Sequence, residues 1–277
     1  SNPYIVKAVQ SQLKLGSHAA FPDFYAELPI LFLEKLHSFL PQEFNKFFFT
    51  NSGTESIEAS LKLAKWHTQK KWLFSFKGAF HGRTLGSLTL TNSKPVQRDR
   101  YQPFYPAKHS SYPYEYRWNN KNYKSVTDDC LAQFEKTIKP IKDNLAAVFI
   151  EPIQGEGGYI VPPKEFVQGI RKICTQNKIL LCSDEVQSGV FRTGKFLGIE
   201  NHNVKPDIIA LAKGIGNGIP FGVMISTKKI MDWVPGSHSN TYGGNLLACA
   251  SGKAGLEYAE KHKIWLNAQR LGSHIKK

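Results

Sequence analysis

The 277-residue chain has few of the features that mark secreted, metal-binding or membrane proteins. Its four cysteines are scattered, with no CxxC pair and no neighbouring histidine cluster, which is untypical of a disulfide-stapled secreted domain or a zinc site. The longest apolar stretch, LPILFLEKL, is interrupted by Glu34 and Lys35 and is much shorter than the ~20 residues that a membrane span needs. No signal peptide is visible. We therefore expect a cytoplasmic protein with reduced thiols, no metal and no membrane partner.

Acidic residues are outnumbered by basic ones. The chain has 36 Lys and Arg against 22 Asp and Glu, a formal net charge of +14. Nucleic-acid binding is one explanation of such a charge. However, the basic residues are spread along the chain, and it has no recognition helix, RNP-like aromatic stretch or zinc finger. The pattern favours a solvated basic surface with an anion-binding cleft, and we expect no nucleic-acid partner.

Short apolar runs alternate with helical patterns, which predicts an α/β fold with a mostly parallel sheet and helices on both faces. The predicted strands are 46–50, 72–76, 146–150, 179–183, 207–211 and 221–226, and the predicted helices are 54–69, 164–177 and 246–262. Segment 92–125 is rich in Pro, Tyr and Arg without clear periodicity, so we expect a long surface loop there. In such sheets ligands bind beyond the carboxyl ends of the strands.

The first predicted strand ends in TNSGTES, which is a candidate phosphate site. Ser52, Gly53 and Thr54 open the following helix, and Gly53 lets the backbone approach a ligand closely. The unpaired N–H groups of a first helical turn, with hydroxyls beside them, suit a phosphate. Ordinary N-capping by Ser or Thr is the alternative explanation.

Two more strand ends carry candidate ligand contacts. In KGAFHGRTLGS, Phe80 could lie on a flat aromatic ligand and the planar fork of Arg83 suits a carboxylate, although a loop aromatic is also often simply packed. We expect His81 to be structural. Glu151 follows strand 146–150 directly and Glu156 lies in a Gly-rich turn. These carboxylates could act as an acid–base pair, or both could be solvated.

Asp184 and Lys213 follow two further apolar strands. A buried carboxylate is costly unless something positive faces it. A lysine with a lowered pKa can form a Schiff base with a carbonyl, although a lysine at a strand end is also compatible with a plain surface residue. Together, a phosphate seat, an aromatic ring, an arginine, a lysine and an aspartate match the needs of pyridoxal 5'-phosphate (PLP). The lysine would hold the aldehyde, and Asp184 would keep the pyridine nitrogen protonated.

With these residues assembled, the sequence resembles the class III (ω-amino-acid) aminotransferases of PLP fold type I. The resemblance runs from NPYIVKAVQ to beyond SNTYGGNLLACA. The motifs that carry it, in the family's order and spacing, are NSGTES, FHGRT, EPIQGEGG, SDEVQSG, RTGKF, LAKGIG and NTYGGN.

The resemblance implies a set of cofactor contacts. The residues concerned are Ser52, Gly53, Thr54, Phe80, Asp184, Val186, Gln187, Lys213 and Thr241. Gly53 and Thr54, with Ser52 beside them, would hold the phosphate. Phe80 would stack on the ring and Val186 would pack on its opposite face. Gln187 would reach the ring hydroxyl.

The catalytic pair implied by the resemblance is Lys213 and Asp184, with Lys213 as Schiff-base lysine and proton shuttle. Thr241 would contact the phosphate of a neighbouring subunit, so a homodimer with shared sites is expected. On the substrate side, Arg83 would take the distal carboxylate and Glu156 would gate a second arginine near the C-terminus. Glu151 would position neighbouring polar groups.

The resemblance also implies a domain division. Residues 1–45 would form an N-terminal helical segment, 46–262 the PLP-binding large domain, and 263–277 the start of a connection to a small C-terminal domain. That small domain, with its gating arginine, is largely missing from this chain. The chain opens with SNPYIV, without an initiator Met, so we expect it to be part of a longer protein.

The function that the resemblance implies is transfer of an amino group from an ω-amino acid to 2-oxoglutarate. The donor, whether 4-aminobutyrate, ornithine, acetylornithine or lysine, stays open. One alternative is a PLP-dependent amino-acid racemase of the same fold, which keeps the amino group on its substrate. Another is a cofactor-free binding module with a basic surface, against which Lys213, Asp184 and NSGT argue together.

Overall fold

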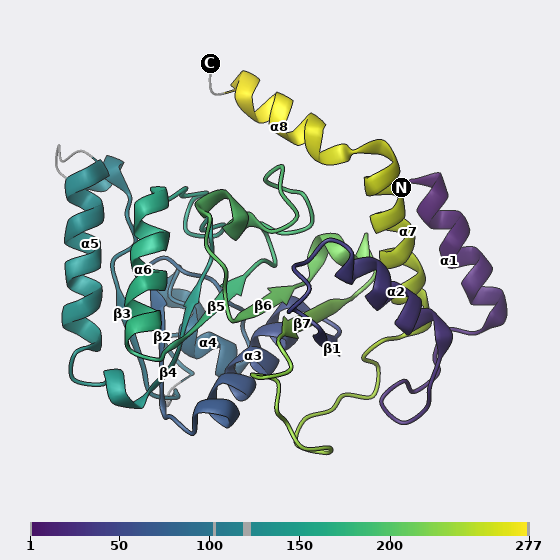
Figure 1. Cartoon of the computed structure of the whole chain (residues 1–277), viewed down its shortest axis with the longest axis horizontal. Coiled ribbons are helices and arrows are strands. Elements are labelled where there is room, and N and C mark those ends of the chain that lie inside the picture. The colour runs from purple at the N-terminus through teal and green to yellow at the C-terminus, as the bar shows by residue number, and fades with distance from the viewer. Residues whose placement is uncertain (1, 102–103, 119–122, 276–277) are drawn as a thin grey trace.

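The computed structural model describes residues 2–101, 104–118 and 123–275. Within these residues one seven-stranded sheet has the order β1-β7-β6-β5-β4-β2-β3 (Figure 1). The strands are β1 Lys46–Thr50, β2 Trp72–Phe76, β3 Ala107–Ser110, β4 Leu145–Ile150, β5 Leu180–Asp184, β6 Ile208–Leu211 and β7 Gly222–Ser226. Only β7 runs antiparallel to its neighbours, β1 and β6. The carboxyl ends of the other strands therefore share one edge of the sheet.

Helices cover both faces of this sheet (Figure 1). Their bounds are α1 Pro3–Leu15, α2 Glu27–His37, α3 Gly53–Thr68, α4 Leu85–Leu90, α5 Tyr123–Ile138, α6 Lys164–Gln176, α7 Leu246–His262 and α8 Ile264–Ile275. One core cluster joins the sheet to α2, α5, α6 and α7, and a second joins it to α3 and α4. Successive strand residues face opposite sides, so Val223 belongs to the first cluster and Met224 to the second. The predicted fold class is thus confirmed.

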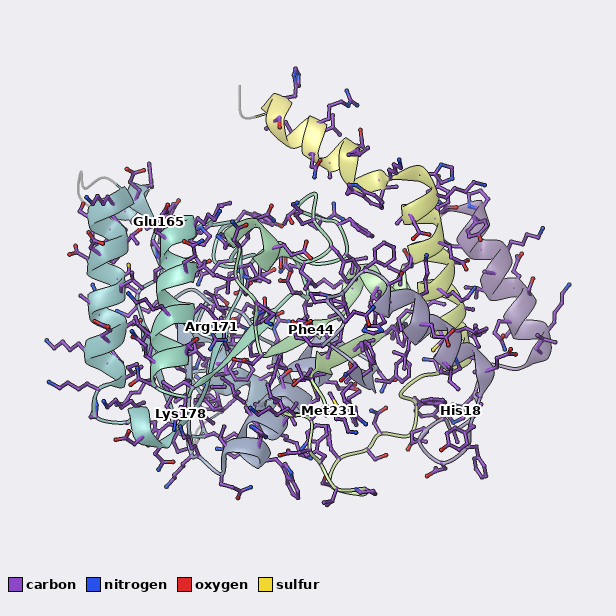
Figure 2. The ribbon with its side chains drawn as sticks, viewed as in Figure 1. His18, Phe44, Glu165, Arg171, Lys178 and Met231 are labelled. Carbon is purple, nitrogen blue, oxygen red and sulfur yellow. The ribbon has the colours of Figure 1, made fainter. Side chains whose placement is uncertain are left out.

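The six predicted strands are all present, with shifts of one residue at a few ends. They were recognisable because most of their residues are buried, and buried strands read as continuous apolar runs. An ion pair ties α6 to the amino edge of the sheet. It joins Nη1 of Arg171, which is labelled in Figure 2, to Oδ2 of Asp207, just before β6, at 2.6 Å.

The prediction of a long loop over 92–125 is wrong. This segment contains β3, which pairs in parallel with β2 at the sheet edge, and the first residues of α5. The sequence of β3 is AKHS, in which only Ser110 is buried, because an edge strand lies partly in solvent. A strand of this kind lacks the apolar run that identified the others. Residues 102–103 and 119–122 of the segment lie outside the described residues.

The predicted N-terminal segment 1–45 contains α1 and α2. Helix α1 packs along α7, with Tyr4 Oη donating a hydrogen bond to Glu257 Oε2 at 3.1 Å. At the other end of the chain, α7 ends where Lys263 takes a left-handed conformation (φ 46°), and α8 begins at the next residue. Among the described residues, no helix combines the length and apolar character needed to cross a membrane.

Candidate cofactor site

A cavity of about 280 Å³ lies at the carboxyl edge of the sheet. Its walls come from the start of α3, the segment after β2 and the ends of β4 and β5. Lys213, two residues after the end of β6, completes them. The lining residues are Gly53, Thr54, Phe80, His81, Gly82, Arg83, Glu151, Asp184, Val186, Gln187 and Lys213. The structure thus brings together most of the site residues predicted from the sequence. Ser52, Glu156 and Thr241 are not among the lining residues.

The start of α3 combines a helix cap with a place for an anion. Ser52 is the N-cap, and its Oγ accepts a hydrogen bond from Glu55 N at 3.3 Å. Glu55 Oε2 in turn accepts from Asn51 N at 2.9 Å, so the polar groups of Ser52 and Glu55 are used in capping. Among the described residues, no acceptor faces the backbone N–H of Gly53 or Thr54. These two N–H groups remain for an anion in the cavity.

Gly53 is required by the close packing of this wall. A Cβ at this position would lie 2.8 Å from Val186 Cγ1, which is too close for a real contact. Val186 is half-buried and lines the cavity itself. The glycine therefore lets the turn after β5 approach the start of α3.

Asp184 ends β5 and is 5% exposed. Its Oδ1 accepts a hydrogen bond from Val186 N at 3.0 Å, and its Oδ2 lies 2.7 Å from His81 Nδ1. His81 is 2% exposed, and its backbone N–H donates to Thr91 Oγ1. An imidazole that donates from Nδ1 would fix the carboxylate in one orientation toward the cavity.

His81, which we expected to be structural, thus contacts the carboxylate of another predicted site residue. Its Nε2 is buried and has no hydrogen-bond partner among the described residues. Sequence reasoning had no signal for this contact, because residues 81 and 184 come from different strand ends.

Glu151 is buried at the end of β4, 5% exposed, so the alternative in which both glutamates are solvated is wrong for this residue. Its two oxygens accept from Phe80 N at 2.8 Å and Gly155 N at 3.0 Å. Burial raises the pKa of Glu151 to about 7, with His81 lowering it and Asp184 raising it further. Glu151 thus holds the backbone on either side of the cavity.

The remaining lining groups lie nearer to solvent. Phe80 is half-buried, and the exposed guanidinium of Arg83 has its Cζ 5.5 Å from the centre of the Phe80 ring. Lys213 is exposed and has a left-handed backbone (φ 47°), which is uncommon for a residue other than glycine. Glu156 and Thr241 are both exposed. Glu156 lies in the turn closed by the Gln154–Ile160 bridge.

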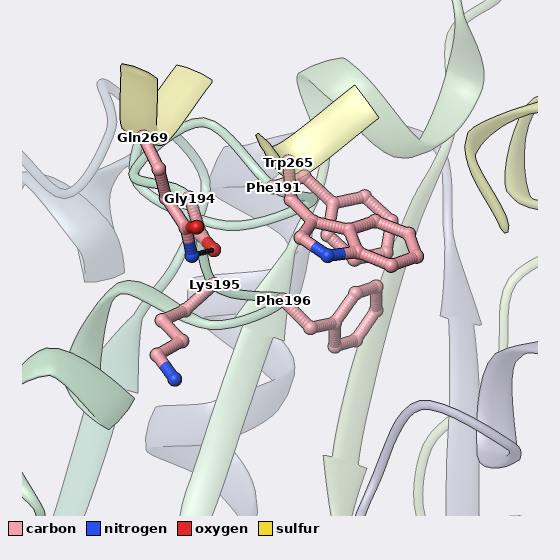
Figure 3. A pocket seen from close by; sticks show the side chains of 6 residues that line it. All are labelled: Phe191, Gly194, Lys195, Phe196, Trp265 and Gln269. Atoms are coloured by element: carbon pink, nitrogen blue, oxygen red, sulfur yellow. Dashed lines mark hydrogen bonds between the residues drawn. The ribbon is translucent and has the colours of Figure 1, made fainter. Parts of the chain in front are cut away.

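A second cavity of about 740 Å³ adjoins the first and shares Val186, Gln187 and Lys213 with it. Part of its wall is α8, through Ala268 and Gly272. Figure 3 shows how α8 is attached beside it, over a smaller pocket. The ring of Trp265 stacks on Phe191 at 5.0 Å, and Gln269 Nε2 donates to Gly194 O at 2.8 Å.

The chemistry of the first cavity fits PLP. Two free N–H groups at a helix start suit its phosphate, and a buried carboxylate held by a histidine suits a protonated pyridine nitrogen. Lys213 offers an amine for the aldehyde, and Phe80 an aromatic face for the ring. Among the described residues, no group of His, Cys, Asp and Glu could hold a metal ion.

Comparisons with known proteins point to the same cofactor. The family model for aminotransferase class III matches residues 1–277. The chain is 37% identical over 272 residues to an acetylornithine aminotransferase of Methanopyrus kandleri, covering 98% of this chain and 65% of that protein. It is 35% identical over 286 residues to an alanine/serine racemase of Pyrococcus horikoshii, covering 99% of this chain and 60% of that protein.

Solved structures give the same likeness. A PLP-bound amine transaminase from an uncultivated Pseudomonas species is similar with a TM-score of 0.93 at 28% identity, covering 99% of this chain and 66% of that chain. The chain spans 65% and 60% of the lengths of the two curated relatives above.

Proposed function

Because the chain belongs to the class III aminotransferase family, we propose that the protein transfers the amino group of an ω-amino acid to 2-oxoglutarate. The observation that carries this proposal is the convergence of Gly53, Thr54, Asp184 and Lys213 on one cavity. PLP is the cofactor of the family. When bound, it supplies an aldehyde that reacts with amines and a protonated ring that accepts electrons.

The residues that line the cavity have separate roles in this proposal. The N–H groups of Gly53 and Thr54 bind the phosphate. Asp184 holds the proton on the pyridine nitrogen, and His81 keeps the Asp184 carboxylate in place through the 2.7 Å contact. The Lys213 amine would hold the aldehyde group of the cofactor, and it would move a proton at the amino-bearing carbon of the substrate.

Substrate binding is proposed for the exposed rim. Arg83 lies at the mouth of the cavity, where its guanidinium can bind a carboxylate through two parallel hydrogen bonds. Glu156 is exposed in the neighbouring turn and is proposed to gate a second arginine. The similarity to an acetylornithine aminotransferase supports an ω-amino donor.

A homodimer with shared sites completes the proposal. Thr241 is exposed and does not line the cavity of its own chain, which supports a contact with the phosphate of a second copy. Large apolar side chains are exposed nearby, with Tyr242 at 61%. The ring of Tyr242 contacts that of His18 at 5.0 Å, in a segment that also exposes Phe24 and Tyr25. Such exposed apolar groups favour burial against a partner.

A cytoplasmic location is part of the same proposal. All four cysteines are free and buried, which is typical of proteins of reducing compartments.

A second candidate function is racemisation, because one relative at 35% identity is an alanine/serine racemase. A racemase needs the same lysine and aspartate, but it returns the proton to the other face of the same carbon. The two functions differ in whether 2-oxoglutarate is consumed.

The experiment is a panel of amino donors assayed with 2-oxoglutarate on the purified PLP-loaded protein. We expect glutamate to accumulate with at least one of 4-aminobutyrate, ornithine and acetylornithine. The contrary result has two parts: alanine or serine is inverted without any 2-oxo acid, and the ω-amino donors give no glutamate. This result would contradict amino-group transfer and favour the racemase function.

A further inference from the structure

The hydroxyl of Thr54, which lines the cofactor cavity, belongs to a cluster of hydroxyl groups. Thr54 Oγ1 lies 2.6 Å from Ser87 Oγ and 2.9 Å from Thr84 Oγ1. The Thr84 and Ser87 hydroxyls are themselves 2.9 Å apart. Two oxygens at 2.6 Å must share a hydrogen atom, so Thr54 and Ser87 form a strong O–H···O hydrogen bond.

Glu58, about one turn along α3 from Thr54, anchors this cluster. Its Oε1 accepts the backbone N–H of Ser87 at 2.9 Å and also accepts the hydroxyl of Thr84. Thr84 is the N-cap of α4 but makes no capping hydrogen bond with its side chain. The Glu58 carboxylate thus caps α4 in its place. It also takes the Thr84 hydrogen, so Thr84 has none to donate to Thr54.

The two glycines of HGRTLGS are needed for this arrangement. A Cβ at Gly82 (φ 126°) would collide with Thr54 Oγ1 and lie 2.6 Å from Ser87 Oγ. A Cβ at Gly86 would collide with Glu58, 2.7 Å from its Cδ. The segment that carries Arg83 therefore follows the hydroxyl cluster closely.

We propose that Ser87 and Thr84 are positioning residues that turn the Thr54 hydroxyl into a hydrogen-bond donor for the cofactor phosphate. Each hydroxyl has one hydrogen to donate. The hydrogen of Thr84 goes to Glu58. Ser87 Oγ can donate either to Thr84 O at 3.1 Å or to Thr54 Oγ1 at 2.6 Å. When Thr54 donates to an anion, the hydrogen of its 2.6 Å contact must come from Ser87, because the stronger charge-assisted bond takes the Thr54 hydrogen. Thr54 then keeps its own hydrogen for an anion beside the N–H groups of α3. This inference rests on the proposed function only in taking PLP as the ligand.

The test measures binding of PLP and of pyridoxal, which lacks the phosphate, to the apoprotein by fluorescence titration. Ser87→Ala and Thr84→Val should each weaken PLP binding about two- to tenfold, the effect of one neutral hydrogen bond. Pyridoxal binding should not change. Thr84→Ser keeps the hydroxyl and should restore the affinity for PLP. Ser93→Ala is the matched control, because the Ser93 hydroxyl bonds to Gln97 and lies outside the cavity lining.

A double-variant comparison separates this role from a merely structural one. If Ser87 acts through Thr54, then adding Ser87→Ala to Thr54→Val should weaken PLP binding no further. Additive losses, equal losses for pyridoxal, or unchanged PLP binding by Ser87→Ala would each overturn the inference. If the unaltered protein binds no PLP at all, the proposed cofactor fails as well, so the two failures are distinguishable.

Discussion

The buried Glu151 carboxyl makes a prediction about how stability depends on pH. Burial raises the pKa of Glu151 from its ordinary 4.5 to about 7 in the folded protein. Between these values the folded state holds a proton that the unfolded state has released. The unfolded state then binds fewer protons, so the contribution of Glu151 to the free energy of unfolding falls as the pH rises.

The magnitude follows from the two pKa values. Integrating the linkage relation from about pH 5 to about pH 8 gives a loss of roughly 2–3 kcal/mol from this one group. Glu151→Gln cannot titrate and should lack this loss. It should also carry a pH-independent destabilisation of about 1–3 kcal/mol, because its amide N–H₂ would face the N–H of Phe80 or Gly155.

The assay is urea unfolding of the apoprotein at a series of pH values, for the unaltered chain and for Glu151→Gln. The difference in unfolding free energy between them should move by roughly 2–3 kcal/mol in favour of the variant from about pH 5 to about pH 8. Glu165→Gln, at an exposed position on α6 (Figure 2), removes a carboxyl that is not part of the cavity lining and serves as control. Parallel curves for the unaltered chain and Glu151→Gln would refute the reasoning.

The proposed roles of the other lining residues give three further predictions. Borohydride treatment of the PLP-loaded protein should abolish its visible colour and leave the pyridoxyl group on Lys213, as mass spectrometry can check; label on another lysine would reject that role. Asp184→Asn should lower turnover by orders of magnitude, and His81→Phe by less, because it removes only the contact that holds Asp184; near-normal turnover of a PLP-saturated Asp184→Asn protein would contradict this. Arg83→Ala should raise KM for ω-amino donors about tenfold to a hundredfold, the effect of a lost charge-assisted contact, and unchanged kinetics would exclude it from substrate binding.

Most of the sheet could be predicted from the sequence because its strands are buried. Strand β4, LAAVFI, is buried along its whole length and reads as one apolar run. Strand β3 could not be found in this way, since its position at the sheet edge leaves it polar. Helix α5 begins within the segment taken as a loop, directly after the residues that lie outside the described structure.

The grouping of Asp184 and Lys213 at one cavity could be predicted, because both follow strands whose carboxyl ends share one edge of the sheet. The contacts that support these residues were not predictable. The hydrogen bonds of His81 with Asp184 and of Glu151 with Phe80 join segments from separate strand ends. Such pairings depend on the order of strands in the sheet, and this order cannot be read from the spacing of residues in the sequence. For Ser52 the sequence allowed either a phosphate contact or a helix cap. The structure shows the side chain used as a helix cap.

The place of β7 in the sheet has a consequence for how the protein is synthesised. Among the described strands, β1 pairs with β7 alone, and β7 lies between β1 and β6. The start of α3 follows β1 directly, whereas Lys213 follows β6. As the chain leaves the ribosome, β1 stays without a partner strand until residues 222–226 have been made. The start of α3 and Lys213 can therefore be brought together in the sheet only after β7 has been made, and until then β1 is an open edge of the kind that promotes aggregation.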